Sequence, residues 1–202
     1  MTSKKLLALF TPATIVVAID QWTKYVVRTS PELHRMDIID GWLSFYYTQN
    51  DGMAMGIDIF STPVISAISI IATIGILAYL LYTIDKAPIG YLILMGLVVG
   101  GALGNITDRL IMGYIEGYGG LLDGHVVDFI FFNLELFDRT VFPYIFNVAD
   151  VAISVSIISL LIFQRKLIPH DVNEEEKTEE TSLMESAVVS GDSTEDNSSE
   201  KE

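Results

Sequence analysis

Residues 63–84 read PVISAISIIATIGILAYLLYTI, and residues 87–107 read APIGYLILMGLVVGGALGNIT. These two stretches, of 22 and 21 residues, contain no charged side chain. A run of about 20 apolar residues is long enough for an α-helix to cross the ~30 Å hydrocarbon core of a bilayer. Both stretches therefore predict membrane-spanning helices.

Two further apolar stretches complete a predicted set of four spans. Residues 6–19 are uncharged and lead into Asp20, and residues 143–163 are interrupted only by Asp150. The first of them also resembles a cleaved signal peptide, because two lysines precede it, but no clear small-x-small cleavage site comes before Asp20. We expect an all-α membrane protein with four transmembrane helices and a small extracytoplasmic β-rich loop region.

The expected β structure lies in the first long loop. Residues 38–47 are rich in β-branched and aromatic side chains with Asp-Gly in the middle, which predicts a short sheet or hairpin. Its Trp and Tyr residues suit the level of the lipid headgroups. Four crossings put both termini on one side of the membrane. Because lysines and arginines abut the span ends on that side, we expect the termini in the cytoplasm.

The charge of the chain is concentrated at its C-terminal end. Residues 167–202 contain 12 acidic residues and two lysines, which account for −10 of the formal net charge of −14. Such a segment has little apolar surface to bury and is expected to be disordered and solvated. We therefore divide the chain into a membrane domain, residues 1–166, and an acidic disordered cytoplasmic tail, residues 167–202.

Residue composition narrows the chemistry that the chain can perform. The sequence has no cysteine, which excludes disulfides, thiol nucleophiles and thiolate metal sites. Its three histidines lack the spacing of metal ligands, so we expect neither a metal nor another cofactor. Carboxylates remain as the candidate catalytic groups. Two carboxylates a few Å apart can share one proton, so that one activates a water while the other protonates a substrate carbonyl.

Polar residues of three predicted spans lie at similar depths in the membrane. At 1.5 Å per residue, Asp20 and Asp150 lie roughly 20 Å above the inner surface, and Asn105 and Asp108 roughly 24–29 Å above it. Asp20–Lys24, Asn105–Asp108 and Asn147–Asp150 each have the spacing of one helix face. Because an ionisable group in a bilayer costs at least ~2.5 kcal/mol, these residues predict a shared polar site beneath the outer leaflet.

The residues alone leave some alternatives open. Asp20 and Lys24 could simply form a structural ion pair that joins the helices. Spacing does not decide which two of four aspartates face each other, namely Asp20, Asp108, Asp128 and Asp150. A small proton or ion transporter is a second class of function, although the lower two-thirds of each span is apolar and offers no path. A non-catalytic assembly factor is a third.

Five short motifs, taken in order, resemble those of signal peptidase II, the bacterial lipoprotein signal peptidase. They are DQWTK at 20–24, NDGMAMG at 50–56, GGALGNITDR at 100–109, VVDF at 126–129 and FNVAD at 146–150. Each motif alone is weak, but each lies at the expected end of a span. The resemblance covers about residues 4 to 166 and leaves the acidic tail outside.

The resemblance implies an aspartic endopeptidase of the bacterial cytoplasmic (inner) membrane. It would remove the signal peptide from diacylglyceryl-modified prolipoproteins by cutting before the lipidated cysteine, with its active site near the outer face. By this resemblance, the two catalytic aspartates of the family correspond to Asp128 and Asp150. The expected partners are these substrates and membrane lipid, and no nucleic acid is expected. We also expect the protein to be a monomer. The supporting positions are Asp20, Lys24, Asn50, Gly52, Asn105, Asp108, Arg109 and Asn147.

Two features depart from the common pattern of the family. Met55 stands where many members have phenylalanine, a soft apolar replacement that should affect packing more than chemistry. The stretch between Arg109 and Asp128 is longer than in common members, and we expect an extended flap or helix beside the site.

Gly52 is expected to allow a close backbone approach rather than to contact substrate.

Overall fold

The structure is a computed structural model that describes residues 3–52, 61–132, 135–136, 139–140 and 144–164. Met55 and the acidic tail, residues 167–202, lie outside the described residues, as does the expected domain boundary at 166/167. All of the described residues belong to one compact unit, Met1–Ile168. The following description concerns that unit.

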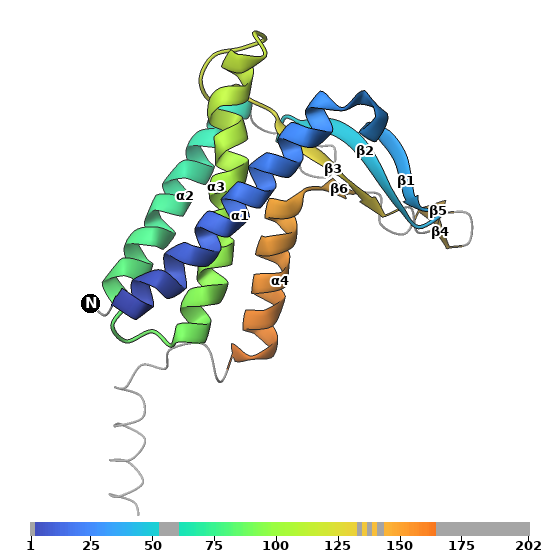
Figure 1. The fold of residues 1–202 in the computed structure, drawn as a ribbon. Coiled ribbons are helices and arrows are strands. Elements are labelled where there is room, and N and C mark those ends of the chain that lie inside the picture. Colours follow the sequence, from blue (N-terminus) through green and yellow to red (C-terminus); the bar gives the residue numbers. More distant parts are fainter. Residues whose placement is uncertain (1–2, 53–60, 133–134, 137–138, 141–143, 165–202) are drawn as a thin grey trace, which may run out of the picture. The chain divides into compact units, whose positions relative to one another are not determined.

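Four α-helices form in the described part of the chain (Figure 1). They are α1 (Ser3–Thr29), α2 (Thr62–Thr83), α3 (Ile89–Ile115) and α4 (Val148–Ile162). The first three are long and apolar enough to cross a membrane. The fourth is apolar but covers only 15 residues, about 22 Å of helix. It is shorter than the expected span at 143–163 because the residues just before its N-cap belong to a strand.

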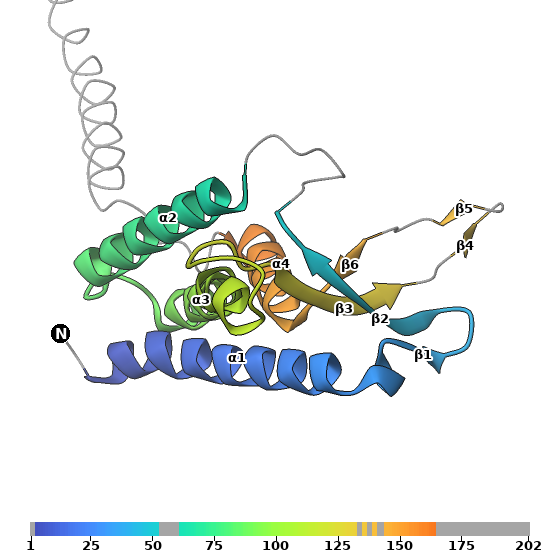
Figure 2. The same cartoon turned by 90° about the horizontal axis from the view of Figure 1, so that it is seen from above.

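A four-stranded antiparallel sheet joins the helices at one end, as Figures 1 and 2 show. Its strands, in spatial order, are β1 (Arg35–Ile39), β2 (Leu43–Asn50), β3 (Val126–Phe132) and β6 (Ile145–Phe146). A 3₁₀ turn, η1 (Pro31–Leu33), connects α1 to β1, and two short strands, β4 (Glu135–Leu136) and β5 (Arg139–Thr140), pair separately. The sheet is therefore larger than the hairpin that we expected, because β3 and β6 add to it.

The expected hairpin is present as β1 and β2. Met36 pairs with Phe45 and Asp37 pairs with Ser44, and the chain turns at Asp40–Trp42. Gly41 has a φ of +71°, a backbone conformation that glycine adopts without strain. The Asp-Gly signal in the sequence thus correctly located the turn.

Of the extended flap or helix expected between Arg109 and Asp128, the structure shows a helix in the first part. The first part of this connection continues α3 to Ile115, and its last part enters β3 at Val126. Between them the chain turns back onto α3, where the backbone N–H groups of Tyr118 and Gly119 both donate to the carbonyl of Gly113. This turn therefore packs on the end of α3 and leads directly into the central strand β3.

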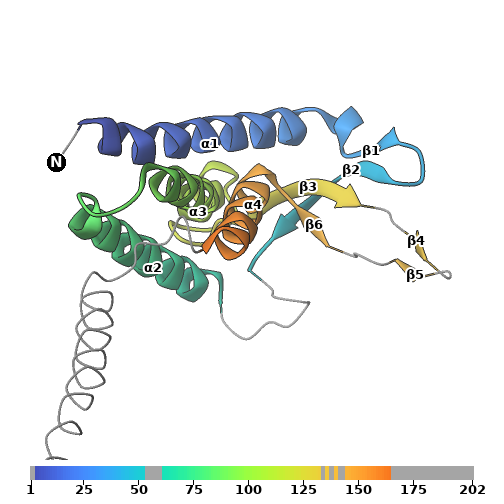
Figure 3. The same ribbon diagram turned by 90° about the horizontal axis from the view of Figure 1, so that it is seen from below.

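Glycines let α3 lie close to its neighbours α1 and α4 (Figure 3). A Cβ added at Gly96 would collide with the backbone carbonyl of Leu9, and one at Gly104 would lie 2.6 Å from Asp20 Oδ2. Apolar helix surfaces that point outward complement this packing, with Ile71 70% and Leu161 65% exposed. Close helix packing through small residues, with apolar surfaces outside, is typical of proteins whose solvent is lipid.

Candidate active site

The central strand β3 and the start of α4 position the two candidate catalytic aspartates. Asp128 is the third residue of β3 and is 3% exposed. Asp150 lies in the first turn of α4, where Asn147 is the N-cap. The Asn147 side chain accepts a hydrogen bond from the Asp150 N–H at 3.0 Å, and Asp150 Oδ2 accepts one from the Asn147 N–H at 3.2 Å. This reciprocal capping box fixes Asp150 at the helix start.

Both neighbours of β3 supply a hydrogen-bond donor to Asp128. Asn50, at the end of β2, donates from Nδ2 to Asp128 Oδ2 at 3.0 Å. Asn147, directly after β6, donates from Nδ2 to Asp128 Oδ1 at 2.7 Å. Because Asn147 also donates its backbone N–H to Asp150, this one residue connects the two aspartates.

Gly52 orients the Asn50 amide. Its N–H donates to Asn50 Oδ1 at 2.9 Å, which leaves the Asn50 Nδ2 group directed at Asp128. Gly52 has a φ of +103°, and a Cβ there would lie 2.6 Å from the Ile65 side chain. The backbone conformation favours glycine at this position.

Burial controls the protonation of Asp128. Removal from water raises the pKa of this carboxyl to about 6, because burial disfavours the charged form. The hydrogen bond from Asn50 lowers the pKa, and the nearby charge of Asp150 raises it. A carboxyl with this pKa can hold or release a proton near neutral pH, which suits an acid or base catalyst.

Asn105 on α3 extends the network around Asp150. Its Nδ2 donates to Asp150 Oδ1 at 2.9 Å, and its Oδ1 accepts from Asn147 Nδ2 at 3.1 Å. Lys24 Nζ also donates to Asn105 Oδ1, at 2.9 Å. The amides of Asn105 and Asn147 therefore lie between the aspartate pair and Lys24.

Lys24 is shared by the other two candidate aspartates. Its Nζ lies 2.8 Å from Asp20 Oδ2 and 2.8 Å from Asp108 Oδ2, and all three side chains are buried. The alternative of a two-residue structural pair was thus incomplete, because Asp108 from α3 is equally close. The sequence analysis had also not assigned a role to Gln21, which donates to Asp108 Oδ1 at 2.9 Å.

The two aspartates bound to Lys24 also hold the backbone beside the candidate catalytic pair. Asp20 Oδ1 accepts the N–H of Ala149 at 2.9 Å, one residue before Asp150. Asp108 Oδ2 accepts the N–H of Val127 at 3.2 Å, one residue before Asp128. Of the four aspartates left open by spacing, two are therefore engaged with Lys24, and the other two are joined through Asn147.

Arg109 brings a positive charge to the same region. Its guanidinium interacts electrostatically with Asp128, Asp150 and Asp108. Within the described residues its buried Nε has no hydrogen-bond partner. Such an N–H group can donate to an oxygen of a ligand that approaches the two aspartates.

The residue types around the site do not favour a metal. In the part of the chain that the structure describes, no group of three or more His, Cys, Asp or Glu side chains could hold a metal ion. Buried amides, one lysine and one arginine surround the carboxylates instead. The arrangement can hold a proton on a carboxyl pair and can bind an oxygen of a substrate.

Comparisons with known proteins identify relatives of this chain. The sequence model of the signal peptidase (SPase) II family matches residues 12–165. The lipoprotein signal peptidase of Pelodictyon phaeoclathratiforme is 32% identical over 166 residues, which cover 79% of this chain and 91% of that protein. The lipoprotein signal peptidase of Shouchella clausii is 38% identical over 149 residues, with 72% and 84% covered.

A solved structure described as a bacterial membrane enzyme has a similar fold. It superposes with a TM-score of 0.58 at 30% identity, and the match covers 77% of this chain and 91% of that one. A second such structure has a TM-score of 0.57 at the same identity, with 80% and 92% covered. The likeness therefore extends over more than nine-tenths of each solved structure and over more than three-quarters of this chain.

Proposed function

The chain belongs to the signal peptidase II family of aspartic-type membrane peptidases, and we propose that it cuts diacylglyceryl-modified prolipoproteins just before the lipidated cysteine, with Asp128 and Asp150 as the catalytic pair. Removal of signal peptides from prolipoproteins is the activity of this family. The cut position, the catalytic pair and the chemical mechanism are our proposals.

One observation carries the assignment of the pair. Asn147 donates its side-chain N–H to Asp128 at 2.7 Å and its backbone N–H to Asp150 at 3.2 Å. Asp20 and Asp108 instead bind Lys24 and backbone N–H groups, which occupies their carboxylates. This difference favours Asp128 and Asp150 as the aspartates that act on substrate.

The pair begins the reaction with one proton, which Asp128 holds because its burial favours the neutral form. Asp150 takes a proton from a water molecule while the water oxygen attacks the scissile carbonyl carbon. Asp128 donates its proton to the carbonyl oxygen, so that a tetrahedral diol forms.

The diol then collapses and the carbon–nitrogen bond breaks. The departing nitrogen takes the proton from Asp150, and a diol hydroxyl returns a proton to Asp128. This restores the starting protonation of both carboxyls. Asn50, Asn105 and Asn147 keep the carboxylates in position, and the unpartnered N–H of Arg109 binds a substrate oxygen.

We place the enzyme in the bacterial inner membrane as a monomer with four spans and cytoplasmic termini. The sheet and the aspartate pair then lie toward the outer face, where α1 and α3 end and α4 begins (Figure 1). The family acts on prolipoproteins in a membrane, so a substrate reaches this site from within the bilayer. No role for nucleic acid is proposed.

Conservative substitution of the aspartates tests the catalytic assignment. Asp128→Asn and Asp150→Asn should each abolish cleavage of a diacylglyceryl prolipoprotein in liposomes while the protein stays folded, because each removes one half of the proton-sharing pair. Asp40→Asn, in the exposed hairpin turn, is the matched control and should keep normal activity. Mass spectrometry of the products gives the cut position. Turnover like that of the wild type by either Asp128→Asn or Asp150→Asn would overturn the assignment.

A further inference from the structure

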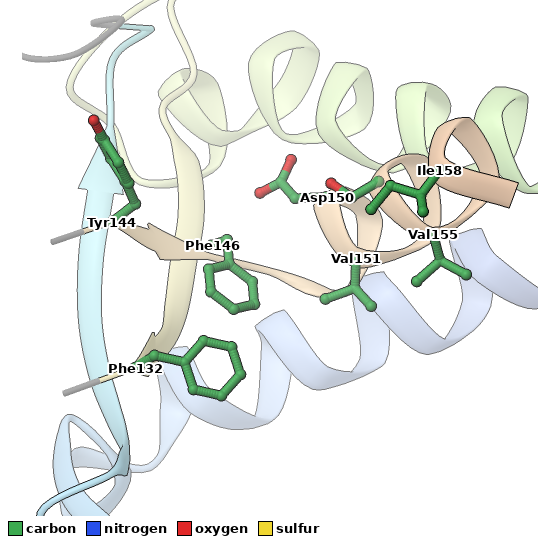
Figure 4. Close-up of a pocket in the computed structure, with 8 residues that line it drawn as sticks. Phe132, Tyr144, Phe146, Asp150, Val151, Val155 and Ile158 are labelled. Carbon is green, nitrogen blue, oxygen red and sulfur yellow. The ribbon is translucent and has the colours of Figure 1, made fainter. Parts of the chain in front are cut away.

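An apolar groove begins at Asp150 and follows one face of α4 (Figure 4). Its volume is about 470 Å³, and its wall is almost entirely apolar. Val151, Val155 and Ile158 form the helix side of the groove. They have the i, i+4, i+7 spacing of a single helix face, and they extend over roughly 10 Å.

Aromatic side chains of the sheet close the groove at the end near Asp150. Phe132 of β3 and Phe146 of β6 line it there, with ring centroids 5.4 Å apart. In the other direction the helix side is open, since Val155 is 52% exposed and Ile158 is 55% exposed. The groove is thus a narrow apolar path that starts at a candidate catalytic carboxylate and leads along the helix.

The chemistry of the wall selects between the two apolar parts of a lipidated substrate. A peptide that is extended around its scissile bond exposes backbone N–H and C=O groups, which need hydrogen-bond partners away from water. Along α4 the groove offers polar side chains only at Asp150 and Ser154 among the described residues. An acyl chain has no polar group to satisfy, and it can pack against this apolar wall by van der Waals contact.

We propose, on the basis of the function proposed above, that this groove binds one acyl chain of the substrate's diacylglyceryl group. The glycerol end lies beside Asp150, and the chain follows Val151, Val155 and Ile158 along the helix. The groove thereby positions the lipidated cysteine, and with it the peptide bond before that cysteine, next to the aspartate pair. Acyl length becomes a determinant of substrate binding.

Blocking the open part of the groove tests this proposal. The variant is Ile158→Trp, and Ile157→Trp is the matched control, because Ile157 is 46% exposed on the same helix but does not line the groove. Val155→Phe provides a second block should Ile158→Trp fold poorly. Each purified protein is assayed in liposomes with one prolipoprotein that carries either short-chain or long-chain diacylglyceryl groups.

We expect the wild type and Ile157→Trp to have a lower KM for the long-chain substrate than for the short-chain one. Ile158→Trp should raise the long-chain KM roughly tenfold, because the indole fills the space that the end of a long chain occupies, and should change the short-chain KM much less. An equal rise for both substrates would overturn the proposal and assign the groove to the signal peptide. No change for either would also overturn it. The proposed function itself fails only if the wild type cleaves neither lipidated substrate.

Discussion

Lys24 neutralises two buried carboxylates that also hold the backbone beside the candidate catalytic residues. It lies within 2.8 Å of both Asp20 and Asp108, and it is 2% exposed. Those aspartates in turn accept the N–H groups of Ala149 and Val127. We therefore propose that the lysine acts on the site through its partners, as a positioning residue.

We predict that Lys24→Met reduces the free energy of unfolding by about 3–5 kcal/mol, since it leaves buried carboxylates without their cation. Denaturant titration of the purified protein in detergent measures this loss. Lys5→Met is the control, because Lys5 makes a partly exposed contact with a backbone carbonyl at the other end of α1. A stable Lys24→Met protein that binds substrate normally but does not turn over would instead assign Lys24 to the chemistry.

Asp128 makes the pH dependence of the reaction predictable. Its pKa is raised to about 6, so the folded protein holds this proton more tightly than the unfolded chain, in which the pKa is near 3.8. The stabilisation from this proton is fully present below about pH 4 and is lost as the pH rises through about 6. In the proposed mechanism Asp128 acts as the acid, and its protonated form disappears over the same range.

We predict that kcat/KM falls above about pH 6, by roughly tenfold per pH unit. Asn50→Ala should move this alkaline limb to higher pH, because the Asn50 hydrogen bond stabilises the charged form of Asp128. A pH–rate profile of the two proteins measures the shift. An Asn50→Ala profile that moves to lower pH, or does not move, would contradict the proton-donor role of Asp128.

The start of α4 depends on one residue with two separate tasks. The Asn147 side-chain oxygen caps the helix, and its Nδ2 group donates to Asp128 and Asn105. A serine can supply the capping oxygen, but it cannot bridge these two groups in the same way. Substitutions at this position can therefore separate the stability of the element from its function.

We predict that Asn147→Ala loses about 1 kcal/mol of stability along with activity, whereas Asn147→Ser keeps most of the stability and still loses activity. Thermal unfolding in detergent and cleavage of a lipidated prolipoprotein are measured on the same preparations. Normal cleavage by Asn147→Ser would show that the bridge between the aspartates is not required.

The arrangement of the helices in the membrane follows from apolar surfaces and charged ends. Three helices are long enough to span, while α4 covers 15 residues, fewer than the about 20 that a spanning helix needs. The chain contains no cysteine, which makes single introduced cysteines specific reporters. Asp40, Asp85 and Gln164 are exposed positions in the β1–β2 turn, in the α2–α3 connection and at the end of α4.

We predict that a membrane-impermeant thiol reagent, applied to intact spheroplasts, labels Asp40→Cys but not Asp85→Cys or Gln164→Cys. With four crossings and cytoplasmic termini, Asp40 is the one of these three positions that lies outside. Lysis should make the other two cysteines reactive, which serves as the positive control. Labelling of Gln164→Cys in intact spheroplasts would show that α4 does not cross the membrane.

Much of the architecture could be predicted because it depends on local composition. The uncharged runs at 63–84 and 87–107 contain all but the first residue of α2 and most of α3, and Asp40-Gly41 marks the hairpin turn. The five motifs correctly indicated the family. Strand β3 was not predicted, because a short apolar run such as Val126–Phe132 does not reveal its type by periodicity. Asn147 followed by Asp150 has the spacing of a capping box and could have located the start of α4.

The grouping of the four aspartates required the tertiary structure. Spacing put Asp20 and Lys24 on one helix face, but it could not show that Asp108 shares the same ammonium group. That contact exists because Gly104 lets α1 approach α3 closely. Likewise, Asn147 reaches Asp128 only because β6 pairs with β3, which places their ends together. Local sequence determines spans and turns, whereas pairing across more than 80 residues of chain decides which charges neutralise one another and which remain for substrate.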